Sequence, residues 1–168
     1  MSDTTPSKPP APGVPAPGPE HQFLLKKVGE WEVDCSYFMS GDDAVEAKGA
    51  DRVEAVGGYW TVGHFEVELY GKQISGRAVT GYDPEKMAYI GSWHDSATPF
   101  FYYFEGQYDE IEKTLRMEGD NTDPMTGNLV TYRSVEEFMD DDTRRFTLSV
   151  ETTPGVETPI LRYEYRRK

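Results

Sequence analysis

Cysteine is almost absent from this chain. Cys35 is the single cysteine in 168 residues, so no internal disulfide can form, which fits a reducing compartment. If the segment around it is an alternating strand, Cys35 shares the parity of Trp31. We therefore expect Cys35 to be a small buried hydrophobe and not a nucleophile.

Basic residues are scarce as well. The sequence has 17 Lys and Arg against 30 Asp and Glu, a formal net charge of -13. Nucleic-acid recognition and anionic membrane surfaces both need clustered Lys and Arg, so neither partner is expected. No apolar run approaches the roughly 20 residues of a spanning helix. The opening residues 1–5 lack the basic-then-apolar order of a secretory signal, and we expect a soluble, cytoplasmic protein.

Helical periodicity is found in one short segment only. In residues 20–27, Phe23, Leu24 and Lys27 have helical spacing, with an acid first and lysines last, an order that suits the helix dipole. Gly29 then allows a sharp turn, because glycine has no Cβ to clash at positive φ. We expect a short helix whose apolar side covers one end of the structure that follows.

Residues 1–19 form a separate region. Proline fixes φ and removes backbone donors, and the glycines and alanines between the prolines have little to bury, so we predict a disordered tail. An alternative is a proline-rich ligand for an aromatic groove. The remaining length, residues 20–168, suits one domain. The prolines of the tail are Pro6, Pro9, Pro10, Pro12, Pro15, Pro17 and Pro19.

An alternation of apolar and polar residues begins after Gly29. Trp31, Val33, Cys35 and Tyr37 alternate with acidic and polar residues, which places one face against a core and the other in water. Strand-like segments bounded by turn residues then recur to the end of the chain. The ten predicted strands are 29–38, 45–55, 59–70, 74–82, 87–94, 100–108, 114–118, 129–138, 145–151 and 160–166.

None of the gaps between these strands can hold a crossover helix. Consecutive strands must therefore pair antiparallel through hairpins, as an open meander, a sandwich or a closed barrel. Closure removes sheet edges, so we favour an all-β, ten-stranded antiparallel up-and-down barrel with a short N-terminal helix. A barrel wider than eight strands tends to keep an interior cavity.

Several spaced motifs carry a family likeness. Together they resemble the domain-of-unknown-function 1579 family (DUF1579) over about residues 20–167, and the opening Gly-x-Trp resembles the calycins, which include lipocalins, fatty-acid-binding proteins and nitrobindins. The resemblance implies a lipocalin-like barrel over residues 20–168, with no assigned activity and no catalytic residues to transfer. Nitrobindins bind haem, but no haem-ligating motif aligns here, and no cofactor is expected. The motifs are Gly29-x-Trp31, Gly57-Gly58-Tyr59-Trp60, Gly81-Tyr82-Asp83-Pro84-Glu85-Lys86, Gly106-x-Tyr108-Asp109, Asp123-Pro124-x-Thr126-Gly127 and Tyr165-Arg166-Arg167.

Aromatic residues are plentiful in the predicted strands. Trp60, Trp93, Tyr102 and Tyr132 combine apolar area with a polar group, as small-molecule pockets favour. The same rings could equally fill the barrel. Residues 100–104 are aromatic on both faces, so one set must point outward or into a contact.

The two histidines within the strands admit two interpretations. His64 and His94 could ligate a metal or haem iron, or act in an acid–base pair with Glu66 and Asp95. Against this, neither has metal-ligand spacing, and metal sites usually need three or more ligands. Hydrogen-bonded or exposed histidines are the simpler interpretation.

Arginines on the late strands could also face the interior. Arg133 and Arg162 alternate with Tyr132 and Tyr163, and an inward Arg could bind a ligand carboxylate or lie across Trp31 at the barrel base. Residues 140–142, three aspartates, lack calcium-loop spacing and are predicted to form a solvated turn.

The function that best fits these features is binding of a small, largely apolar ligand in the barrel cavity. The alternatives are an enzyme that uses His64 or His94 with a neighbouring acid, and an interaction module that uses the tail or an aromatic outer patch. No metal site is predicted, and self-association as a homodimer stays open. The predicted ligand-binding residues are Trp60, His64, Trp93, His94, Tyr102, Tyr132 and Arg133.

Overall fold

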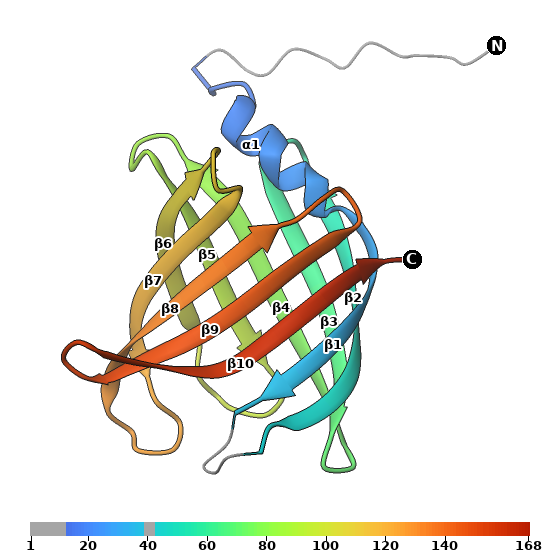
Figure 1. The fold of residues 1–168 in the computed structure, drawn as a ribbon. Coiled ribbons are helices and arrows are strands. Elements are labelled where there is room, and N and C mark those ends of the chain that lie inside the picture. The colour runs from blue at the N-terminus through green and yellow to red at the C-terminus, as the bar shows by residue number, and fades with distance from the viewer. Residues whose placement is uncertain (1–12, 39–42) are drawn as a thin grey trace.

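Ten antiparallel strands close into one barrel in the part of the chain that the structure describes (Figure 1). The structure is a computed structural model that describes residues 13–38 and 43–168. Each strand pairs with its neighbours in sequence, and the first pairs with the last, so the predicted up-and-down barrel is confirmed. The strands are β1 Gly29–Tyr37, β2 Val45–Val56, β3 Trp60–Leu69, β4 Lys72–Asp83, β5 Ala88–Asp95, β6 Tyr102–Asp109, β7 Thr114–Thr122, β8 Leu129–Phe138, β9 Thr143–Thr153 and β10 Val156–Arg167.

Four strands, β4, β7, β9 and β10, are at least three residues longer than predicted. β7 continues past Glu118 to Thr122, because its polar C-terminal half still pairs with β8. β10 begins at Val156 and not at Ile160, and it passes Pro159 with register shifts on either side. Proline interrupts a strand pattern in sequence, but an irregular ladder accommodates it.

One end of the barrel is covered by a short helical segment. The α-helix α1 spans Pro19–Leu24 and continues as a 3-10 helix, η1, over Leu25–Lys27. In Figure 1 this segment lies across the upper end of the barrel. Phe23 and Leu24 are buried there against Tyr89 and Leu115, which confirms the predicted helix and its covering role.

The Gly-x-Trp motif is where the chain enters the barrel. Gly29 has φ +138°, and the Arg167 guanidinium occupies the place that a Cβ would need. Arg167 Cζ lies 4.2 Å from the centre of the Trp31 ring, and the guanidinium donates to the carbonyls of Val28 at 2.7 Å and Lys26 at 2.8 Å. A glycine at position 29 thus leaves room for the Arg167 guanidinium, which links β10 to η1 and β1.

The arginines across Trp31 differ from those considered in the sequence. Arg144 and Arg167 lie over the Trp31 ring, with Arg144 Cζ 4.7 Å from its centre. Arg162 is exposed and its Cζ lies 6.0 Å from the Phe38 ring, so the inward position considered for Arg162 is wrong. In β10 the inward parity belongs to Tyr163 and Tyr165, which are buried.

Cys35 lies in the core around Trp31, as expected. It is fully buried in β1 beside Val33, Phe65 and Tyr163. Burial raises the pKa of its thiol to about 12, so the thiolate is not formed near neutral pH.

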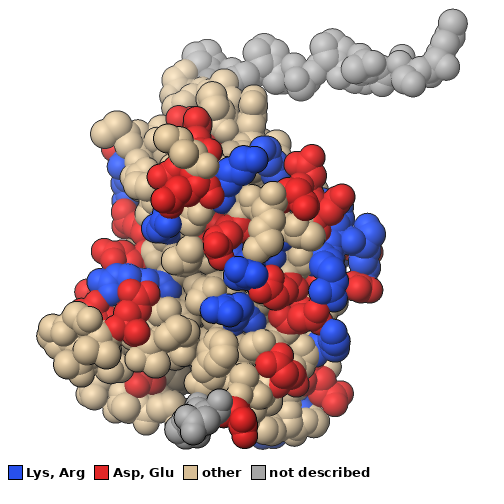
Figure 2. Space-filling model, in the orientation of Figure 1, with Lys and Arg blue, Asp and Glu red and all other residues tan. Residues whose placement is uncertain are grey.

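The predicted tail falls largely on residues 1–12, which lie outside the described residues. In the described part, the Tyr59 hydroxyl donates to the Pro15 carbonyl at 2.7 Å, and Pro17 lies beside Gly58. The boundary at residue 19 stays a prediction. Neither helical segment seen here has the length and apolar character needed to cross a membrane. Figure 2 shows acidic and basic side chains interspersed over one face of the barrel.

Candidate ligand-binding cavity

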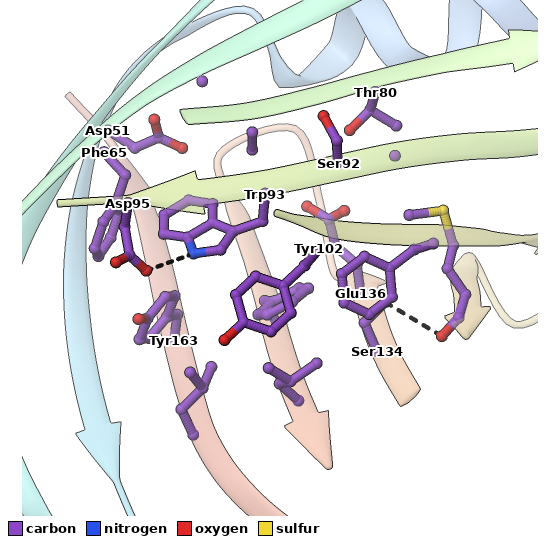
Figure 3. Close-up of a pocket in the computed structure, with 18 of the residues that line it drawn as sticks. Asp51, Phe65, Thr80, Ser92, Trp93, Asp95, Tyr102, Ser134, Glu136 and Tyr163 are labelled. Atoms are coloured by element: carbon purple, nitrogen blue, oxygen red, sulfur yellow. Dashed lines mark hydrogen bonds between the residues drawn. The ribbon is translucent and has the colours of Figure 1, made fainter. Parts of the chain in front are cut away.

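The barrel encloses a cavity of about 450 Å³ (Figure 3). Its wall is built from the inward-facing residues of the strands, mostly apolar. The helical segment covers one end through Lys27, and Ala97, Thr98 and Pro124 contribute at the other end, from the loops that follow β5 and β7. A cavity of this size and lining is within the range of small-molecule sites.

Aromatic rings form the wall towards the loop end. Trp93 from β5 meets Phe65 edge-on, with ring centres 5.9 Å apart, and Phe65 stacks on Tyr163 at 5.1 Å. Tyr102 and Tyr132 meet edge-on at 5.7 Å. These rings come from strands β3, β5, β6, β8 and β10, so an apolar molecule inside the barrel would meet aromatic surface from several directions.

Trp93 is held in one orientation. Its indole lies over Gly76 of β4, where any Cβ would clash. Its Nε1 donates to Asp95 at 2.8 Å (Figure 3). The second oxygen of Asp95 accepts from the Ala97 backbone at 2.8 Å. A ring fixed in this way loses little further conformational entropy when it contacts a ligand.

Tyrosine hydroxyls supply hydrogen-bonding groups in this wall. The hydroxyls of Tyr37 and Tyr163 are hydrogen-bonded at 2.9 Å. Burial raises the pKa of Tyr37 and of Tyr132 to about 12. Each therefore stays a neutral phenol at pH 7, able both to donate and to accept a hydrogen bond.

The end of the cavity beneath the helical segment is charged. Lys27 Nζ lies 3.1 Å from one oxygen of Glu136, and Arg144 Nη1 is hydrogen-bonded to the other. Arg144 Nη2 lies 3.6 Å from Asp51, too far for a hydrogen bond. The Arg144 guanidinium also lies over the Tyr165 ring, 3.6 Å from its centre. These four side chains, Lys27, Asp51, Glu136 and Arg144, are called the charged end below.

The two acids of the charged end are in different electrostatic states. For Asp51, burial is the dominant influence and raises the pKa, although Arg144 and Lys27 oppose it. For Glu136, burial alone would raise the pKa, but the charges and hydrogen bonds of Lys27 and Arg144 outweigh it and lower the pKa. At Glu136 the charges of Lys27 and Arg144 act most strongly against burial, and both carboxylate oxygens are also hydrogen-bonded, whereas Oδ1 of Asp51 has no hydrogen-bond partner.

Three of the seven predicted ligand-binding residues line the cavity, namely Trp93, Tyr102 and Tyr132. The other four, Trp60, His64, His94 and Arg133, lie on the outer face of the barrel. Trp60 is 37% exposed and covers Gly81. Arg133 binds Glu118 at 3.1 Å and also pairs with Glu151.

Both histidines face away from the barrel interior. His64 Nε2 lies 2.6 Å from Glu54 and not beside Glu66, which bonds to Gln73 and Ser75. His94 is exposed and stacks on Phe101 at 6.0 Å. Since consecutive strand residues point to opposite faces, an outward His94 cannot act together with the inward Asp95. The considered acid–base pairs His64–Glu66 and His94–Asp95 are therefore wrong.

In residues 13–38 and 43–168, no group of three or more His, Cys, Asp or Glu side chains is arranged to hold a metal ion. In the 140–142 segment, the Asp140 carboxylate accepts from the Asp142 backbone at 2.8 Å. That bond is internal to the turn, as in a solvated turn.

Sequence reasoning missed the charged end. Within the strands, acids and bases look like outward residues, and Asp51, Glu136 and Arg144 were not singled out. A signal existed: Asp51 shares the parity of the buried Val53, and Glu136 lies two residues after Ser134 and four after Tyr132. A charged residue at an inward position of a β-barrel is a candidate for ligand recognition.

The chain matches one protein family and is similar in fold to solved barrel structures. A family model described as "Protein of unknown function (DUF1579)" matches residues 16–167. The fold is similar to Rv2717c from M. tuberculosis, with 13% identity, a TM-score of 0.68 and coverage of 90% of this chain and 98% of that chain. It is also similar to the S-type phycobiliprotein lyase CPES from Guillardia theta, with 16% identity, a TM-score of 0.60 and coverage of 87% and 91%. No curated protein matches the sequence. At these identities the similarity concerns the fold alone.

Proposed function

Because the chain belongs to the DUF1579 family, whose description names no activity, we propose a function from the geometry of the barrel: it binds a small, largely apolar ligand in its cavity. The observation that carries the proposal is the space of about 450 Å³ inside the barrel, with its aromatic wall. Protein interiors are normally packed without voids larger than a water molecule, so a cavity of this size supports a role in ligand binding. Removal of apolar surface from water would supply the affinity.

Trp93 is the ring on which affinity should depend most. It is fixed by Gly76 and Asp95, its six-membered ring faces the cavity side of β4, and it belongs to the same wall as Phe65 and Tyr102. Aromatic side chains held in this way dominate binding energies at apolar sites.

The test uses a matched pair of tryptophan variants. Nile red, a neutral dye that fluoresces in apolar surroundings, should bind the wild-type protein. Trp93→Ala should weaken this binding about tenfold, equivalent to about 1.4 kcal/mol, because the indole is the largest ring in the wall. Trp60→Ala removes the same side chain from the outer face and should leave the dissociation constant unchanged.

Thermal unfolding of both variants separates a lost contact from a lost fold. The proposal fails if wild-type protein leaves the dye unbound, or if folded Trp93→Ala binds it as tightly as the wild type does.

A further inference from the structure

The charged end of the cavity is electrically balanced. Lys27 and Arg144 carry two positive charges, and Asp51 and Glu136 in ionised form carry two negative ones. All four line the cavity, and Asp51, Glu136 and Arg144 are 8%, 5% and 3% exposed. In so buried a site, an added full charge would stay uncompensated and would cost several kcal/mol.

Hydrogen bonding at the charged end is incomplete. Lys27 and Arg144 satisfy both oxygens of Glu136. In contrast, Asp51 Oδ1 and Arg144 Nε and Nη2 are buried without a hydrogen-bond partner. Unpaired groups of this kind are rare in folded proteins and each costs about 1–3 kcal/mol. The site thus keeps one unused acceptor side chain beside one unused donor side chain.

Asp51 and Arg144 both line the cavity, so a molecule inside it would contact these two side chains. Asp51 is an inward residue of β2, and in Figure 3 its carboxylate points into the barrel, as does that of Glu136. Rotation about the terminal torsion of Asp51 exchanges its two oxygens at low cost. Arg144 Nη2 lies 3.6 Å from Asp51, so one ligand group could bond to both side chains.

We propose that Asp51 and Arg144 recognise a neutral polar group that both donates and accepts hydrogen bonds, such as a primary amide or a hydroxyl, at the end of an otherwise apolar ligand. This inference rests on the proposed function. An amide N–H or a hydroxyl donates to Asp51, and the amide or hydroxyl oxygen accepts from Arg144. The net charge stays zero, and the unpaired groups acquire partners.

Charged head groups fit less well. A carboxylate would add a third acid beside two bases and would face the Asp51 carboxylate, which lines the same end of the cavity. An ammonium group could donate to Asp51 but has nothing to accept from Arg144. The site should therefore discriminate by hydrogen bonding and against net charge of either sign.

The experiment compares four probes with the same eight-carbon chain: octanamide, octanol, octanoate and octylammonium. Each is titrated at neutral pH against protein loaded with Nile red, and displacement of the dye gives its affinity. Octanamide and octanol should bind about tenfold more tightly than octanoate and octylammonium, since the ions lack a complementary charge.

Asp51→Asn tests the assignment to this side chain. The substitution keeps the shape and leaves the charged end with a net charge of +1, so the ratio of octanoate to octanamide affinity should rise about tenfold. Asp120→Asn is the matched control: Asp120 is exposed on the outer face, where it accepts from Thr131, and its loss should leave all four affinities unchanged.

The outcomes separate the two proposals. If Nile red binds but the four probes compete equally, or octanoate binds most tightly, the head-group inference is wrong while cavity binding stands. If neither Nile red nor any probe binds, both are wrong. Should Asp51→Asn fail to fold, the wild-type ranking decides alone.

Discussion

Glu136 is an acid at a position where a lone carboxylate would be very costly. It is 5% exposed, and Lys27 and Arg144 pair with its two oxygens. Replacement of a whole buried ion cluster by well-packed hydrophobic residues is often neutral or stabilising, but removal of one partner leaves the remaining charges buried and unpaired. Glu136 therefore matters for stability mainly because its loss would leave the buried charges of Lys27 and Arg144 without their partner.

We expect Glu136→Gln to lower the free energy of unfolding by about 3–5 kcal/mol at pH 7, because two cations would be left facing only Asp51. Urea denaturation of the variant and the wild type measures this difference. A matched control is Glu118→Gln, whose carboxylate is 64% exposed and pairs with Arg133 on the outer face; it should cost less than about 1 kcal/mol.

The same residue predicts an acid-sensitive stability. The pKa of Glu136 is lowered in the folded barrel from its ordinary value of 4.5, so its contribution is complete above pH 4.5 and is lost as the pH falls through the folded-state pKa. The wild type should lose stability over that range. The difference in free energy of unfolding between the wild type and Glu136→Gln should therefore become smaller. Denaturation series at successive pH values check this, and a constant difference would contradict it.

At the scale of elements, the helical segment is a cover held by side chains on one side only. Phe23 stacks on Tyr108 with ring centres 3.8 Å apart, and Leu24 is 1% exposed, whereas the next residue, Leu25, is 37% exposed. A six-residue helix has little stability of its own. Packing against the strand ends, and not helix propensity, must keep it in place.

Leu24→Ala and Leu25→Ala form a matched pair on this cover. Leu24→Ala should lower the free energy of unfolding by about 3 kcal/mol through lost burial and a cavity. Leu25→Ala should change it by less than about 0.5 kcal/mol, because the side chain is substantially exposed. Equal losses for the two variants would show that the helix packs through a different face.

For the whole molecule, Arg167 adds side-chain bonds where the pairing of β1 with β10 closes the barrel. Its guanidinium reaches the carbonyls of Lys26, Val28 and Asp141, at 2.8, 2.7 and 2.9 Å, and it stacks on Trp31. It therefore connects the last strand with η1 and with the turn between β8 and β9.

Arg167→Ala should lower the free energy of unfolding by more than about 2 kcal/mol, since several charge-assisted bonds are lost at once. The adjacent Arg166 is 51% exposed and pairs with Asp34 at 2.7 Å, so Arg166→Ala should cost less than about 1 kcal/mol. Chemical denaturation compares the two. A small loss in Arg167→Ala would mean that closure rests on the β1–β10 ladder alone.

The fold could be predicted because its signals are local. Alternation and turn residues act over a few positions, and hairpin pairing of consecutive strands needs no long-range information. The start of β1 at Gly29 and the bounds of β8 agree with the prediction. Strand ends differed where polar residues or Pro159 continue a ladder that the side-chain pattern does not mark.

The site could be predicted only in part, because it depends on which face of each strand turns inward. In β3, Phe65 and Val67 alternate with Glu66 and Glu68, which fixes odd residues as inward and puts Trp60 outside. The expectation that Trp60 lines the cavity rested on its apolar area and polar group, which do not show which face of the strand it occupies. Arg144 could not be placed from its own strand, because its inward position is compensated by Glu136 and Asp51 on other strands.

The pairing of β1 with β10 has a consequence for the order in which the protein can be made. Residues 31–37 pair with residues 161–167, so one edge of β1 has no partner until almost the whole described chain has left the ribosome. Every earlier hairpin can form as it emerges, but the pairing of β1 with β10 requires closure of the longest loop in the barrel. During that interval the nascent chain presents an open strand edge to its neighbours. Crowding of ribosomes on one message should therefore favour aggregation through β1, and slower initiation should relieve it.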